Sequence, residues 1–191
     1  MIPELWLSIS QAFANGVEGK SELWDSAHTE WRVAEPRYSG CTGMRRHPSL
    51  IPLSRQHHNG LALGVLGMRA LSEDRSAAGI ATVAKQAVDY FDFELVNHFE
   101  VEEQVLFPIC GPMPLVEELV ADHRALERMI GDLRNAPSES LLEEFFNRLR
   151  DHIRREEREF FEEIQRALPP ETLEHAGVEI EKRVARFCLR S

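Results

Sequence analysis

Apolar residues recur along most of the chain at intervals of three and four, the spacing that places them on one face of an α-helix. Stretches rich in proline, glycine and small polar residues, such as CGPMP and NAPSES, divide this pattern into segments. The pattern predicts five helices, at about 50–72, 76–106, 114–135, 140–167 and 171–188. No segment shows the convincing alternation of apolar and polar residues that is typical of a β-strand.

Four long helices joined by short turns pack as antiparallel neighbours, so the predicted fold is all-α, an antiparallel four-helix bundle. Residues 1–46 are the least regular part and are interpreted as an N-terminal extension or linker. The bundle is expected over 47–168, and 169–191 are expected to form an extra C-terminal helix packed on it. Ser54 is a candidate N-cap of the first bundle helix, with a start a few residues earlier as the alternative.

Composition narrows the class of protein. The chain has 191 residues, of which 43% are hydrophobic and 28% charged, and its net charge of −10 argues against a nucleic-acid surface. It has no apolar run long enough to span a membrane, and its N-terminus lacks the features of a signal peptide. The three cysteines are widely spaced and form no CxxC pair, which is typical of free thiols in a reducing compartment. We therefore expect a cytoplasmic protein.

Candidate chemistry lies on the apolar faces of the four long helices. Each face carries one histidine: His57, His98, His123 and His152. Glu102 and Glu156 follow two of them by four residues, and residues at i and i+4 share a helix face. A carboxylate buried alone is costly, so two such pairs indicate a shared positive charge. Imidazole and carboxylate ligands suit iron, zinc or manganese, and two glutamates could bridge two ions.

A single histidine on an apolar helix face is more often a hydrogen-bonded core residue than a metal ligand. The repetition in four consecutive helices is what favours a metal site. Other signatures are absent: no histidine has the Glu-x-x-His spacing of ferritin-like di-iron proteins. The chain also lacks HExxH, GxSxG and phosphate-binding glycine loops.

Four phrases in order, HPSLIPLSRQHHNGLAL, HFEVEEQVLFP, ADHRALERMI and HIRREEREFF, resemble the hemerythrin-like HHE cation-binding domain family, especially its bacterial branch. The resemblance covers about 47–167. It implies a non-haem centre of two iron ions inside the bundle that binds dioxygen, nitric oxide or peroxide. By position, it implies the ligands His57, His98, Glu102, His123, His152 and Glu156, with the two glutamates as bridges.

The sequence departs from oxygen-carrying hemerythrins at two positions. Those proteins have a second histidine one turn after the third-helix ligand, whereas this chain has Glu127, either a substitute ligand or, as we favour, a solvent-facing acid. They also bridge with an aspartate five residues after the last-helix histidine. Glu157 has that offset here and is expected to point away from the core, and Glu103 is likewise expected to face water.

The first-helix ligand has two candidates, His57 and His58. His57 shares its face with Leu53 and Leu61, which favours it over His58. An extra histidine ligand could come from His58 or His47.

Three functions fit the predicted fold and the candidate metal site. The first is a di-iron protein that binds or senses a small diatomic or peroxide ligand, or stores and supplies iron. The second is a di-iron oxidoreductase or an iron-cluster repair enzyme, for which neither Cys110 nor Cys41 is marked as a redox partner. The third is a metal-free helical scaffold. The sequence favours the first, and it favours neither a nucleic acid nor a membrane as partner.

Overall fold

The computed structural model describes residues 45–188, within which every regular element is a helix. The first long helix consists of η1 (Pro48–Leu50) and α3 (Ile51–Glu73). The second comprises α4 (Ala77–Tyr90), η2 (Phe91–Leu95), α5 (Val96–Val101) and η3 (Glu102–Leu106), and ends in η4 (Phe107–Cys110). The third is α6 (Pro114–Asn135). The fourth comprises α7 (Glu139–Arg155), η5 (Glu156–Phe160) and α8 (Phe161–Ala167), and the last helix is α9 (Pro170–Cys188).

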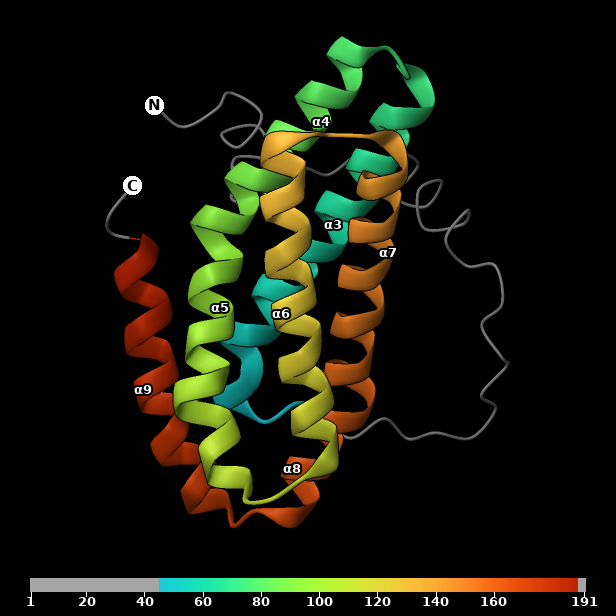
Figure 1. Cartoon of the computed structure of the whole chain (residues 1–191). Coiled ribbons are helices and arrows are strands. Elements are labelled where there is room, and N and C mark those ends of the chain that lie inside the picture. The colour runs from blue at the N-terminus through green and yellow to red at the C-terminus, as the bar shows by residue number, and fades with distance from the viewer. Residues whose placement is uncertain (1–44, 189–191) are drawn as a thin grey trace. The chain divides into compact units, whose positions relative to one another are not determined.

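The four long helices form a closed ring. Helix α3 packs against α4 and α7, and α6 packs against the same two helices (Figure 1). Helix α9 lies outside this ring, against η1, α5 and η3. The predicted all-α bundle with an additional C-terminal helix is therefore confirmed. The predicted N-terminal extension lies outside the described residues, apart from Arg45 and Arg46.

The starts of the helices follow ordinary capping chemistry, with one correction. Ser76 and Ser138 cap α4 and α7 by accepting backbone N–H groups. The prediction that Ser54 caps the first helix is wrong, because α3 begins at Ile51, directly after η1. His47 caps η1 instead, since its Nδ1 accepts the N–H of Ser49 at 3.3 Å.

Two glycines mark the closest approaches between helices. A Cβ at Gly67 would overlap the ring of Phe146 on α7, and a Cβ at Gly177 would overlap Ser49 in η1. Without a side chain at these positions, α3 lies directly on α7 and α9 directly on the first turn. This close packing holds α3 in position on the core.

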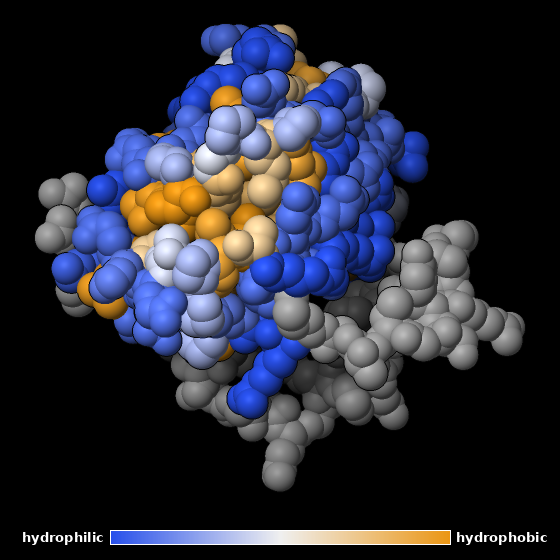
Figure 2. All heavy atoms as spheres, turned by 90° about the horizontal axis from the view of Figure 1, so that it is seen from below, coloured by the Kyte–Doolittle hydropathy of each residue, from blue (hydrophilic) through white to orange (hydrophobic). Residues whose placement is uncertain are grey.

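The core continues to the end of the bundle where α6 begins and α8 ends. Figure 2 shows that end, with an apolar area surrounded by hydrophilic residues. Partly buried side chains of the segments at this end, Ile109, Met113 and Leu168, pack onto the fully buried residues beneath them. Among the described residues, no helix combines the length and the apolar character that crossing a membrane requires.

Candidate metal centre

Six polar side chains meet inside the bundle, each at most 3% exposed: His57, His98, Glu102, His123, His152 and Glu156. We call them the His/Glu cluster. Each long helix supplies one histidine, and the glutamates come from η3 and η5, one turn after the histidines of α5 and α7. The i, i+4 spacing read from the sequence therefore brings each pair to the same buried face.

The cluster consists of two halves that share their carboxylates. The first half contains His57 and His98, the second half contains His123 and His152, and Glu102 and Glu156 belong to both. Within each group of four, the potential ligand atoms all lie within 4.8 Å of one another. Each half can therefore hold one metal ion, with both glutamates placed between the two positions.

Distances in the first half fit ligands of one ion. Nε2 of His57 lies 2.9 Å from Nε2 of His98 and 2.9 Å from Oε2 of Glu156. Nε2 of His98 lies 3.3 Å from Oε1 of Glu102. Two nitrogens bound at about 2.1 Å to one ion, at about 90° to each other, are separated by about 3.0 Å. The donor atoms therefore already stand at the spacing that adjacent ligand positions require.

The second half is built in the same way. Nε2 of His123 lies 3.4 Å from Oε2 of Glu102, and Nε2 of His152 lies 3.2 Å from Oε2 of Glu156. Glu102 thus directs one oxygen toward each half, as a bridging carboxylate does. The geometry supports the sequence-based view that the glutamates are shared.

The cluster contains polar atoms that nothing in the protein satisfies. Both oxygens of Glu102, both oxygens of Glu156, and Nε2 of His123 and of His152 are buried and have no hydrogen-bond partner. A buried carboxylate without a partner destabilises the folded protein by roughly several kcal/mol. A cation bound between these atoms would satisfy all of them, so the residues present fit a metal ion.

Each histidine directs Nε2 into the cluster and Nδ1 toward an outer partner. His57 donates from Nδ1 to Glu157 at 2.7 Å, and His123 donates from Nδ1 to Glu103 at 2.8 Å. The other two Nδ1 atoms face Gln56, at 3.0 Å from His98, and Asp122, at 3.8 Å from His152. Hydrogen-bonded outer partners fix the tautomer and the orientation of metal-binding histidines, which applies here to His57, His123 and His98. Nδ1 of His152 is too far from Asp122 for a hydrogen bond.

The positions of Glu103 and Glu157 correct two expectations. Both were expected to face water or to point away from the core, yet each is only about a quarter exposed or less, at 22% and 26%. Each lies in a π-helical turn that begins at the preceding shared glutamate, η3 or η5. A π turn changes the direction of the side chains within it compared with an α-helix, and such turns are common at functional sites.

The cluster favours positive charge. Burial alone lowers the pKa of His57, but the nearby carboxylates of Glu156 and Glu157 outweigh burial and raise this pKa to about 10. Burial likewise lowers the pKa of His123, and Glu102 and Glu103 raise it to about 11. Burial raises the pKa of Glu156, but the charge of His152 and other histidine contacts hold it well below its ordinary value. The carboxylates are thus ionised, and their charge is balanced by the protonated imidazoles of His57 and His123 or by a cation that takes the place of those protons.

Aromatic rings enclose the histidines. The ring of Phe99 stacks on His123 with 3.8 Å between centroids, and Phe107 stacks on the same histidine at 5.8 Å. The ring of Phe161 stacks on His57 at 5.4 Å. These rings form an apolar shell on the faces of the two histidines.

The additional ligand candidates, His58, Glu127 and His47, do not join the cluster. His58 is exposed on another face of α3, whereas His57 is buried. The side chain of Glu127 is 41% exposed and bonds Arg124 at 2.6 Å, so it is a solvent-facing acid. His47 caps η1. Within the described residues, the cluster therefore contains one histidine from each long helix and no second one.

Cys110 is a free thiol near the end of the second long helix. Its Sγ donates to the carbonyl oxygen of Leu106 at 3.2 Å. Burial, together with the charge of Glu163, raises the pKa of this thiol to about 11. A thiol with so high a pKa is a poor nucleophile and a poor redox partner near neutral pH.

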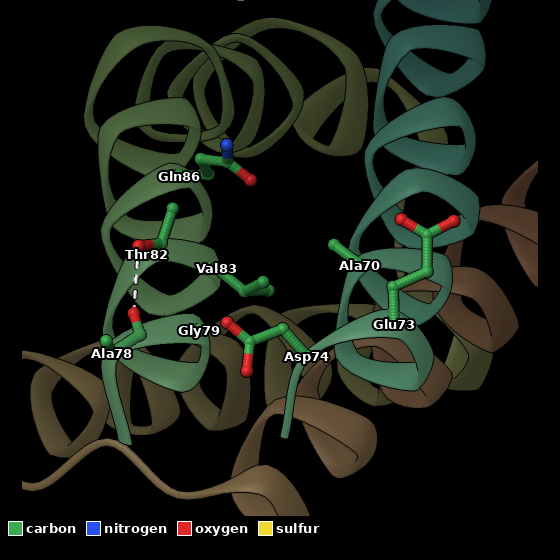
Figure 3. Close-up of a pocket in the computed structure, with 8 residues that line it drawn as sticks. All are labelled: Ala70, Glu73, Asp74, Ala78, Gly79, Thr82, Val83 and Gln86. Atoms are coloured by element: carbon green, nitrogen blue, oxygen red, sulfur yellow. Dashed lines mark hydrogen bonds between the residues drawn. The ribbon is translucent and has the colours of Figure 1, made fainter. Parts of the chain in front are cut away.

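A separate surface pocket lies between the end of α3 and the start of α4 (Figure 3). Two of its polar side chains bond to the local backbone. Asp74 accepts the N–H of Ser76 at 2.9 Å, and the hydroxyl of Thr82 donates to the carbonyl oxygen of Ala78. No residue that lines this pocket belongs to the His/Glu cluster.

Comparison with known proteins agrees with this geometry. A family model described as the hemerythrin HHE cation binding domain matches residues 49–164, more than half of the chain. The matched range contains all six residues of the cluster. No curated protein and no solved structure gives a significant match.

Proposed function

Because the chain belongs to the hemerythrin HHE cation-binding domain family, we propose that its His/Glu cluster binds two iron ions and, through them, a small oxidant. The ligand set in this proposal is four histidines and two shared glutamates, and the oxidant is dioxygen, nitric oxide or peroxide. The observation that carries the proposal is the pair of buried groups with Glu102 and Glu156 in common.

The donor set supports iron. Imidazole nitrogen together with carboxylate oxygen suits iron, zinc and manganese, and two histidines with a carboxylate are a frequent ligand set for non-haem iron. Each half offers four residues, fewer than the six ligands of an octahedral ion. Bound iron would supply redox chemistry and open coordination positions at this place.

The protein's own residues prepare the centre. Glu157 and Glu103 hold the Nδ1 protons of His57 and His123, which leaves Nε2 free to bind. Phe99, Phe107 and Phe161 cover the histidine rings. Such a shell favours small uncharged oxidants over bulky or charged substrates. The full burial of the six side chains favours a resident metal over iron that is passed on.

The competing functions have less support. A repair enzyme or thiol-dependent oxidoreductase would need a reactive cysteine, and Cys110 has its pKa raised to about 11. Cys41 lies outside the described residues. A metal-free scaffold would keep six buried polar atoms without partners inside its core, at a large cost in stability.

The test is anaerobic reconstitution with ferrous iron, followed by elemental analysis and absorption spectra before and after exposure to oxygen. Wild-type protein is expected to hold two iron ions per chain and to gain a charge-transfer absorption on exposure. His98→Ala should lower the iron content and abolish that absorption, because His98 is a buried member of the first half.

The matched control is His58→Ala, which removes an exposed histidine next to His57 and should change neither readout. Wild-type protein that takes up no iron would contradict the proposal and favour the scaffold. Turnover of peroxide or nitric oxide far above the rate of free iron would favour the oxidoreductase instead.

A further inference from the structure

Arg46 reaches the cluster from outside the four helices. It lies in the segment that precedes η1, and its side chain is 23% exposed. Its Nη2 donates to the carboxylate of Glu157 and, at 2.8 Å, to the backbone carbonyl of the same residue. The same carboxylate accepts the Nδ1 proton of His57 through its other oxygen, Oε1. Arg46 therefore holds the group that orients a cluster histidine.

A second contact leads from Arg46 to the same histidine. The guanidinium carbon lies 4.9 Å from the centroid of the Phe161 ring, within the range of a cation–π interaction. Phe161 stacks on the ring of His57 with an interplanar angle of 20°. Arg46 thus touches both groups that fix His57: the acceptor of its Nδ1 proton and the ring on its face.

The backbone around Arg46 is also docked on the bundle. The N–H of His47 donates to Oε1 of Gln165 in α8 at 2.9 Å, and Nε2 of Gln165 donates to the carbonyl oxygen of Arg45 at 3.4 Å. The position of Arg46 therefore depends on how residues 45–47 lie against α8.

The second half has a comparable relay that needs no outside segment. Arg124 pairs with Glu103, which accepts the Nδ1 proton of His123. Arg124 follows His123 directly on α6, and its side chain is 45% exposed. Ion pairs this exposed contribute little, so Arg124 is expected to matter less than the more buried Arg46.

We propose that Arg46 is a positioning residue of the first half, and that it makes the orientation of His57 depend on the docking of residues 45–47. The consequence for metal affinity rests on the proposed function. The consequence for the His57 ring does not, because the contacts of Arg46, Glu157 and Phe161 involve only the protein.

The first experiment needs no metal. In the chelator-treated full chain, NMR should detect slowly exchanging Nδ1 protons of His57 and His123, since both are buried and hydrogen-bonded. Arg46→Met should broaden or remove the His57 signal and leave the His123 signal. Arg166→Met removes an exposed arginine of α8 that pairs with Glu162, and it should leave both signals. An unchanged His57 signal in Arg46→Met would overturn the proposal.

The second experiment is a titration of the full chain with Co²⁺, followed by visible absorption. The binding step that His98→Ala removes identifies the first half. Arg46→Met should weaken this step by up to about 10-fold, the lower end of the effect of losing an outer partner, because Arg46 acts through Glu157; the other step should be unchanged. Arg124→Met should affect the other step, and by less. Equal weakening of both steps by Arg46→Met, or no weakening, would overturn the proposal.

Arg46→Lys provides a milder version in case the methionine variant does not fold. Lysine keeps the charge but loses the planar set of donors and the ring stacking. A His57 signal and a first-half affinity equal to wild type would overturn the proposal. Failure of wild-type protein to bind any metal would contradict the proposed function, while the NMR experiment would still decide the role of Arg46.

Discussion

The half of the cluster that contains His98 and the half that contains His123 differ in their outer partners. In the first half, one imidazole faces a carboxylate and the other faces the neutral amide of Gln56. In the second half, Nδ1 of His123 donates to the carboxylate of Glu103, whereas Nδ1 of His152 lies 3.8 Å from the carboxylate of Asp122 without a hydrogen bond to it. The halves thus differ in one imidazole, which faces a neutral amide in the first half and a carboxylate in the second. Because a nearby negative charge stabilises a bound cation, we expect the second half to bind its ion more tightly than the first.

A further difference lies beside the first half. Glu94, one turn before His98, is only 4% exposed and accepts a hydrogen bond from Asn59 at 2.9 Å. Burial raises its pKa from 4.5 to about 7, although Asn59 and the charge of His57 lower it. The first half therefore has a third acid beside it, Glu94, in addition to the two shared glutamates. Ionising this acid destabilises the folded protein.

The largest expected effect comes from the residues that both halves share. Glu102→Gln should weaken binding in both halves by more than about 100-fold, because a neutral amide replaces a carboxylate placed between the two ions. Metal content after reconstitution and gel filtration measures this. The control is Glu159→Gln, an exposed position in the same π-helical turn as Glu156. A Glu102→Gln protein that keeps one ion at wild-type affinity would show that Glu102 serves only one half.

The next effect concerns the free energy of unfolding of the protein, to which the buried acid beside the first half contributes. Because the pKa of Glu94 is raised in the folded protein, its contribution to the free energy of unfolding is fully present below pH 4.5. This contribution is lost as the pH rises through about 7. Glu94→Gln removes this loss, because glutamine stays neutral and its amide oxygen can still accept from Asn59. The variant should be more stable than wild type by about 3 kcal/mol at pH 8, and by much less at pH 5.

Urea unfolding of the chelator-treated protein at both pH values tests this expectation. Glu100→Gln, an exposed position on the same helix, is the matched control and should show no such pH dependence. A gain for Glu94→Gln that is the same at pH 5 and pH 8 would mean that the acid does not titrate between them.

The smallest expected effect comes from a substitution that makes the second half resemble the first. Glu103→Gln replaces the carboxylate partner of His123 by an amide, the type of group that Gln56 presents to His98. The affinity of the second half should fall by about 10-fold, the lower end for an outer partner, because the amide oxygen still accepts the Nδ1 proton. A two-step Co²⁺ titration would then show the two affinities closer together. Affinities that move further apart would contradict the comparison.

The helices and the inner residues of the cluster were predictable from the sequence. The apolar period identified each long helix, and the i, i+4 spacing of His98 with Glu102 and of His152 with Glu156 placed each pair on one buried face. The same reasoning favoured His57 over His58, and the structure buries only His57. Local periodicity was sufficient because these side chains lie at the centres of their helix faces.

The outer partners were not predictable in this way. A regular helix turns about 100° per residue, which directs Glu103 and Glu157 away from the face of the preceding glutamate. Both residues lie in π-helical turns, where that angle does not apply. The doubled glutamate in HFEVEE and in HIRREE was the available signal, because it recurs beside each shared carboxylate.

The role of Arg46 depends on contacts that no local pattern encodes. Arg46 and Glu157 lie 111 positions apart in the chain, and their pairing follows from the way residues 45–47 dock on α8. Gln56 and Asp122 are similar cases, since each faces a histidine on a different helix. Such partners depend on how neighbouring helices are rotated, which the period of one helix does not define.

The most direct test of the central claim is a crystal structure of the iron-loaded protein, with anomalous diffraction to locate iron. The account predicts two iron ions per bundle. One should lie at Nε2 of His57 and His98 and the other at Nε2 of His123 and His152, with the carboxylates of Glu102 and Glu156 between them. A single ion, or iron bound away from these six side chains, would contradict it.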